Sequence, residues 1–214
     1  MRRIFLGIST ANFQLTAREN GKIESYRFGN KSVDISVSKA GGHIIYMRKN
    51  RLAREHVITV EQAVEKAKRF LLQNGIKKMA ETYYFIDEGV CTINFAYVDG
   101  ATLCYTDLIK VGVAMDDGEV VLYEAGGYIS NHKNRAFESA VYTEKQAAKK
   151  LNEKLKILKT DLVLIPTSAG KETRCYEFLC SDQDTEVLVY INVLTCEQED
   201  ILILLKSDAG TLVK

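Results

Sequence analysis

The chain has 214 residues, of which 46% are hydrophobic and 27% are charged, and its formal net charge is +1. This composition is that of a globular protein with a packed core, so it excludes extended disorder. The near-neutral charge also disfavours non-specific binding to nucleic acid, which needs a basic surface.

No apolar run reaches the roughly 18–20 residues of a membrane-spanning helix. The apolar stretch at residues 4–8 stops at Ser9, which is short of the core of a secretory signal peptide. We therefore expect the chain as given to be soluble.

The first predicted elements are strands, which occupy the region from Phe13 to Met47. Residues 33–47 alternate β-branched and polar side chains around the turn residues Gly41 and Gly42, which is the pattern of a β-hairpin. A helix is predicted next, over residues 60–73, because its apolar positions form one stripe.

The middle of the chain predicts strands at 79–87 and 91–98, followed by a hairpin over 109–123 that turns at Gly118. A second helix is predicted over residues 144–158. Its start repeats the start of the first helix, since residues 141–150 align without gaps with residues 57–66. Both starts have the T-x-x-Q capping-box pattern, at Thr59 and at Thr143.

The last part of the chain predicts strands at 161–166 and 174–180 and a third hairpin over 187–205. The turn of this hairpin, near residues 195–198, contains no glycine, so we expect it to be longer or bulged.

These elements predict an α+β protein built from tandem units, in which each unit packs one helix on an antiparallel sheet of about four strands. The expected units are residues 1–53, which hold at most the end of a helix, residues 54–137 and residues 138–214.

Signatures of an enzyme are missing. The sequence contains no nucleotide-binding glycine loop, no G-x-S-x-G elbow and no H-E-x-x-H motif. Its five cysteines form no C-x-x-C pair and are interpreted as small buried residues. We predict no catalytic residue, no cofactor and no metal site, and leave a cysteine-dependent hydrolase as an alternative.

Two polar clusters are candidate binding surfaces. One is a basic patch made of Arg48, Lys49, Arg51 and Arg54, which is either a solvated boundary between units or a docking surface for an acidic partner or an anionic polymer. The other is the glycine-containing segment 124–135, which is either a binding loop or a connector between units. The predicted partner-binding residues are Tyr128, Asn131, His132, Arg135, Arg48 and Arg51.

The same region carries a family resemblance. Residues 104–111, 117–120 and 124–132, with the pattern Cys-Tyr…Asp-Leu-Ile-Lys and a downstream Gly-Tyr…Asn-His, resemble the C-terminal region of the YpeB family of spore-germination proteins. Residues 38–43 and 174–178 resemble the same family in its first and third repeats. The hairpin-bearing repeat resembles a PepSY domain, which implies a cystatin-like unit. Thr106 departs from the pattern, in which we expect a proline.

The resemblance implies a non-enzymatic role. It implies a protein of the dormant spore that holds, stabilises and inhibits a cortex-lytic enzyme of the SleB type. The location implied is the outer face of the inner spore membrane or the intermembrane space, reached through an N-terminal anchor that this chain lacks. Direct binding of cortex peptidoglycan is the alternative, favoured by the basic patch and by 11 tyrosines.

Overall fold

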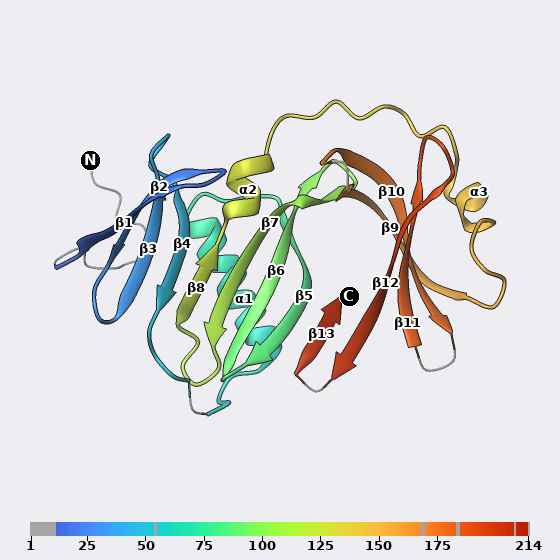
Figure 1. The fold of residues 1–214 in the computed structure, drawn as a ribbon. Helices are drawn as coiled ribbons and strands as arrows, with labels where there is room; N and C mark the ends of the chain where they lie inside the picture. Colours follow the sequence, from blue (N-terminus) through green and yellow to red (C-terminus); the bar gives the residue numbers. More distant parts are fainter. Residues whose placement is uncertain (1–11, 54, 168–169, 183–184, 208, 214) are drawn as a thin grey trace.

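A computed structural model describes residues 12–53, 55–167, 170–182, 185–207 and 209–213 of the chain. The fold is a mixed α+β architecture that is mostly sheet, with thirteen strands and three helices in the described residues (Figure 1). The α+β class expected from the sequence is thereby confirmed. No helix within the described residues is long and apolar enough to cross a membrane.

The first four strands form an antiparallel meander. They are β1 (Gln14–Asn20), β2 (Glu24–Gly29), β3 (Val33–Ser38) and β4 (Ile44–Lys49). The predicted hairpin over 33–47 is confirmed as β3 and β4, and both Gly41 and Gly42 adopt positive φ in its turn. Strand β4 then pairs with β8, so this meander continues directly into the next strands.

The second block consists of one helix and four strands. They are α1 (Val60–Gln73), β5 (Met79–Asp87), β6 (Val90–Asp99), β7 (Thr102–Ala114) and β8 (Val120–Glu124). The predicted bounds of α1 and its capping box between Thr59 and Gln62 are confirmed. The helix packs on one face of these strands, where its Ala63, Ala67 and Leu71 are at most 2% exposed.

The third block contains α3 (Glu144–Ala148), β9 (Lys156–Pro166), β10 (Glu172–Asp182), β11 (Thr185–Asn192), β12 (Gln198–Ser207) and β13 (Gly210–Val213). The predicted hairpin over 187–205 is confirmed as β11 and β12. Its turn is the long, bulged one expected, with Cys196 at positive φ in place of a glycine.

The predicted helix over residues 144–158 is wrong beyond Ala148. Its capping box forms, but Asn152 then accepts a hydrogen bond from the Lys154 N–H in a turn, and Lys156 enters β9 opposite Ser181. Leu151 and Leu155 still pack on the sheet, so the apolar stripe serves the same core without helical backbone. Pairing with β10 therefore overrides the local helical pattern.

Strands of the second and third blocks close into a ring. The start of β7, Thr102–Cys104, pairs in parallel with Leu162–Leu164 of β9, and Gly210 of β13 pairs with Phe85 of β5. The ring runs β7, β6, β5, β13, β12, β11, β10, β9 and back to β7. Both blocks contribute side chains to one apolar cluster in the interior of the ring. The second block contributes Tyr83, Leu103 and Tyr105, and the third block contributes Val163, Cys175, Leu188 and Leu204.

Candidate functional site

The predicted binding segment 124–135 folds into a short helix and the start of a linker. The helix, α2 (Gly126–Asn131), lies beside β7 and β4 and is followed by the extended strand-free segment that leads to α3 (Figure 1). Ala125 anchors its start by donating its N–H to the carbonyl of Ile45. Gly127 passes so close to β7 that a Cβ there would lie 3.2 Å from the Leu108 carbonyl oxygen.

Arg135, in this linker, forms hydrogen bonds to the buried carboxylate of Asp107 on β7. Asp107 is 0% exposed, and the Arg135 guanidinium donates from Nη2 to its Oδ1 at 2.7 Å and from Nη1 to its Oδ2 at 2.9 Å. The Thr106 hydroxyl donates to Oδ1 at 2.9 Å, and His132 Nδ1 lies 2.8 Å from Oδ2. A buried carboxylate is tolerated here because all of its acceptor positions are used.

The same guanidinium reaches the third block. Arg135 Nη2 donates to Oε1 of Glu172, on β10, at 2.6 Å, and its Nε donates to Oε2 at 3.2 Å. These bonds, together with Lys133 at 2.9 Å, lower the pKa of Glu172 to about 2, and the two carboxylates raise the pKa of Arg135. We call Asp107, Arg135 and Glu172 the Arg135 clamp. It fastens β7, the linker and β10 to one another.

The other predicted residues of this segment support the clamp. His132 stacks on Tyr128 with 4.3 Å between ring centres and meets the edge of Tyr97 at 4.5 Å, which fixes the orientation of its ring toward Asp107. Asn131 donates from Nδ2 to the Thr106 carbonyl at 2.7 Å and accepts from Lys22 Nζ at 3.0 Å.

The structure thus brings Tyr128, Asn131, His132 and Arg135 together, but it engages them in internal contacts. The Arg135 side chain is only 5% exposed. Sequence reasoning missed its partners Asp107 and Glu172, because nothing local to β7 or β10 marks them as a pair.

A surface pocket of about 490 Å³ lies on the other side of α2. We call it the α2 pocket. One wall is the β1–β2 turn, the second is the β3–β4 turn and the third is α2 itself. Its lining residues are Lys22, Ile23, Glu24, Ser38, Lys39, Ala40, His43, Ile129 and Ser130. The sequence offered one signal for it, since residues 38–43 carry part of the family resemblance.

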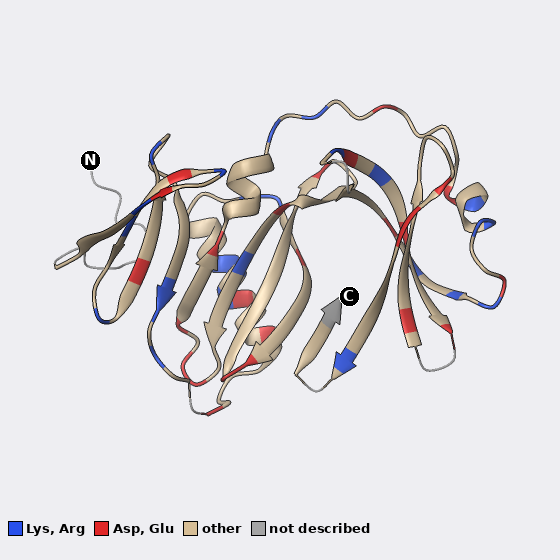
Figure 2. Cartoon of the chain, viewed as in Figure 1, with Lys and Arg blue, Asp and Glu red and all other residues tan. Residues whose placement is uncertain are grey.

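The predicted basic patch is largely charge-compensated. Arg51 forms ion pairs with Asp116, with Asp117 at 2.7 Å and with Glu119 at 3.4 Å. The hydrogen bond to Asp117 is the main cause of the raised pKa of Arg51. Arg48 is exposed on β4, and Arg54 lies outside the described residues. Over the whole chain, basic and acidic residues are scattered among one another (Figure 2).

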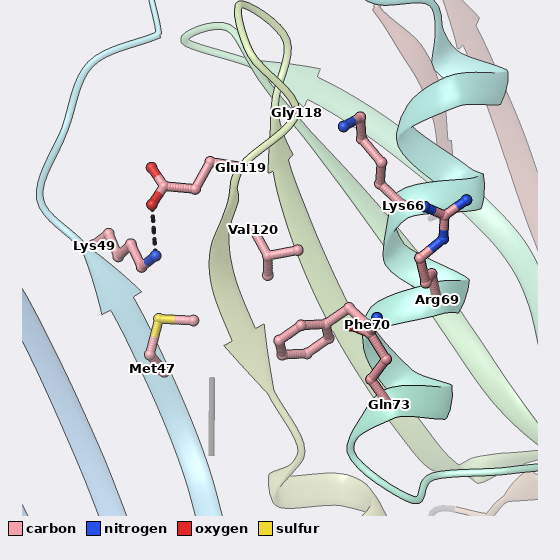
Figure 3. A pocket seen from close by; sticks show the side chains of 9 residues that line it. All are labelled: Met47, Lys49, Lys66, Arg69, Phe70, Gln73, Gly118, Glu119 and Val120. Atoms are coloured by element: carbon pink, nitrogen blue, oxygen red, sulfur yellow. Dashed lines mark hydrogen bonds and ion pairs between the residues drawn. The ribbon is translucent and has the colours of Figure 1, made fainter. Parts of the chain in front are cut away.

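A second pocket, of about 310 Å³, lies between α1 and strands β4 and β8 (Figure 3). Phe70, Met47 and Val120 form its apolar part, and Lys49 is paired with Glu119 at 2.6 Å. The stem of Lys66 lies over the β7–β8 turn, where a Cβ on Gly118 would come 2.3 Å from its Cε. Lys66 and Arg69 give this pocket, here called the α1 pocket, an excess of positive charge.

The thiols are not placed for nucleophilic chemistry. All five cysteines are buried and none is in a disulfide. Burial raises the pKa of Cys91 and of Cys104 to about 11 and that of Cys175 to about 12, whereas a reactive thiol needs a lowered pKa. Within the described part of the chain, no group of three or more His, Cys, Asp or Glu side chains is arranged to hold a metal ion.

Comparison with known proteins decides the family. Residues 5–138 match the model described as "YpeB sporulation, PepSY1 and PepSY2 domains". The chain belongs to the YpeB family. It is 30% identical over 167 residues to sporulation protein YpeB of Halalkalibacterium halodurans, and 29% identical over 171 residues to that of Bacillus subtilis. Each alignment covers 78% of this chain and 37% or 38% of the relative, so the chain spans little more than a third of a curated YpeB.

The fold matches a solved YpeB structure. The Bacillus megaterium YpeB C-terminal domain superposes with a TM-score of 0.80, and the match covers 94% of this chain and 93% of that one. Sequence identity in this match is 21%, so the likeness concerns the fold. The clamp and the two pockets are therefore built on a YpeB-like sheet.

Proposed function

We propose that this YpeB-family chain is a non-enzymatic binding module of spore germination, in which tandem PepSY units hold and restrain a cortex-lytic enzyme of the SleB type. The observation that carries the proposal is the match of residues 5–138 to the YpeB sporulation family. The buried thiols, with their raised pKa, support a binding role over thiol catalysis. The proposed location is the spore, at the outer face of the inner membrane.

The α2 pocket is the surface that we assign to the partner. Ile23, Ala40 and Ile129 give it apolar contact area, and Lys22, Glu24, Lys39 and His43 supply a polar rim, which is the composition of many non-obligate interfaces. The Arg135 clamp stiffens the backbone behind it, so the pocket needs little reorganisation on binding.

The test is calorimetry of this chain with a SleB-type cortex-lytic enzyme from the same organism, combined with hydrolysis of cortex fragments. We expect binding and slower hydrolysis, and we expect Ile129→Glu to weaken binding at least about tenfold, since it places a charge in the apolar wall. Lys154→Glu, in the exposed turn before β9, is the matched control. If the chain does not bind the enzyme, the proposal fails. If both variants bind as wild type does, the α2 pocket is the wrong surface.

Direct binding of cortex peptidoglycan is the second candidate. The α1 pocket favours it, because Lys66 and Arg69 beside an apolar floor suit carboxylates attached to a polymer. Co-sedimentation with isolated cortex at low salt tests it, with the Lys66→Ala/Arg69→Ala double variant expected to pellet less. The absence of pelleting by the wild-type chain would remove this candidate.

A further inference from the structure

A carboxyl group is buried inside the strand ring. Glu177, on β10, is 4% exposed and points into the interior that the second and third blocks share. Its Oε1 accepts a hydrogen bond from the Tyr105 hydroxyl of β7 at 3.1 Å. Its Oε2 is buried and has no hydrogen-bond partner among the described groups. An ionised carboxylate with one orphaned oxygen is costly in such a place.

The groups around Glu177 offer little to balance a negative charge. Tyr105 of β7 donates a hydrogen bond to it, the Tyr190 hydroxyl of β11 also favours its charged form, and Tyr83 of β5 lies beside Tyr105. On β9, Asp161 acts on it as a like charge, and Lys159, whose positive charge opposes this effect, is paired with Asp161 at 2.6 Å. Glu186 of β11 and Asp200 of β12 add negative charge near the tyrosines.

Burial raises the pKa of Glu177 and outweighs the opposing effect of the Tyr105 and Tyr190 hydroxyls, which favour the charged form. The same burial and the nearby carboxyl groups raise the pKa of all three tyrosines, so these are neutral donors at neutral pH. The neutral acid is therefore the form that fits this interior.

Two short seams close the ring whose interior holds Glu177. One seam is the parallel pairing of Thr102–Cys104 with Leu162–Leu164. The other consists of Gly210 opposite Phe85 and of the Ile86 N–H donating to the Ala209 carbonyl at 2.6 Å. Gly210 has no room for a side chain, since a Cβ there would lie 2.3 Å from the Tyr84 carbonyl oxygen. Few backbone hydrogen bonds therefore oppose separation of the two blocks.

We propose that Glu177 is a proton-operated lock of the strand ring: the neutral acid closes the two seams, and ionisation loosens them. A carboxylate formed in the interior draws in water or swings outward, and either response parts Tyr105 from β10. The pKa of Glu172 is about 2, so its ion pair with Arg135 persists at neutral pH and the blocks remain tethered while the seams open. This inference does not depend on the identity of the partner.

Hydrogen exchange of the full chain, measured by mass spectrometry from pH 5 to pH 9 and corrected for intrinsic rates, tests the lock. In wild type, we expect exchange in peptides covering residues 84–87, 102–104 and 162–164 to increase at least tenfold as pH rises, while peptides of α1 keep their protection. Glu177→Gln, a neutral mimic of the acid, should hold the seams closed at every pH. Glu197→Gln, in the exposed β11–β12 turn, is the matched control and should behave as wild type does.

Tyr105→Phe keeps the test decisive if Glu177→Gln folds poorly. It removes a hydroxyl that favours the carboxylate, so the pH at which the seams loosen should move upward. A purely structural role of Tyr105 would instead raise exchange at all pH values. Seam exchange that does not change with pH in wild type, or that rises equally in wild type and Glu177→Gln, would overturn the proposal.

Discussion

Arg135 and Asp107 form a two-pronged ion pair between a linker and the middle of a strand, and the carboxylate in it has no exposed surface. The Arg135 guanidinium also hydrogen-bonds to Glu172 and thereby connects the linker to β10. A segment that has the composition of a mobile loop is thereby held against two strands. The pair is buried, so its loss would leave an uncompensated charge.

We expect Arg135→Met to lower the free energy of unfolding by about 3–5 kcal/mol, because it strands the Asp107 carboxylate in the interior. Urea unfolding followed by circular dichroism measures this loss. Lys133→Met is the control, since Lys133 is 62% exposed and its ion pair with Glu172 is worth less than about 1 kcal/mol. Equal losses in the two variants would contradict the assignment of Arg135 as the centre of the clamp.

The clamp should weaken in acid. The pKa of Glu172 in the folded chain is about 2, below its ordinary value of 4.5. The stability that its ionised form contributes to the fold is therefore fully present above about pH 4.5 and is lost as the pH falls toward 2. We expect wild type to exceed Glu172→Gln in unfolding free energy by about 2–3 kcal/mol at pH 7, and by much less near pH 2. A difference that stays constant from pH 7 to pH 2 would be evidence against this ionisation.

Gly89, in the β5–β6 turn, is a position where a single methyl group should be harmful. Its φ is +74°, and a Cβ there would lie 2.4 Å from the carbonyl oxygen of Ala53. We expect Gly89→Ala to cost about 1–3 kcal/mol and to lower the melting temperature by several degrees. Gly21→Ala is the matched control, because nothing lies within 4 Å of a Cβ there. Scanning calorimetry measures the melting temperatures. If Gly89→Ala has the same melting temperature as wild type, the predicted clash is refuted.

The cysteine thiols should be unreactive in the folded chain. Because all five cysteines are buried and burial raises the pKa of Cys91, Cys104, Cys175 and Cys180, we expect almost no reaction with an aromatic disulfide reagent at pH 8. All five should react in denaturant. Rapid labelling of one thiol in the native chain would revive the hydrolase alternative, and replacement of that cysteine by serine would then decide it.

Local features were predictable because their causes are local. Thr59 with Gln62 and Thr143 with Gln146 form the two capping boxes that the T-x-x-Q pattern indicates. The hairpins also follow from alternation around turn residues. The second helix was mispredicted because its stripe of leucines satisfies a core equally well from the irregular segment that follows Ala148.

The ring and the clamp were not predictable in this way. The pairing of Leu103 with Val163 and the meeting of Arg135 with Glu172 are set by how the blocks dock, and no spacing within either segment encodes them. The sequence indicates a partner-binding role for Arg135 only because the residue is polar. In the structure its side chain points inward and pairs with Asp107. A partner-binding role stays a prediction for all six residues, which are Tyr128, Asn131, His132, Arg135, Arg48 and Arg51.

Strand β7 also constrains how this architecture can evolve. Repeat proteins commonly gain or lose whole units, because each unit meets its neighbours through a standard interface. Here the start of β7 is already occupied by β9, and β13 returns to β5. An extra copy of the third block would find both positions taken, and deletion of that block would leave Leu103 and Tyr105 in water. Duplication or loss of the third block therefore requires compensating changes in β5 and β7, which favours retention of the whole ring across descendants.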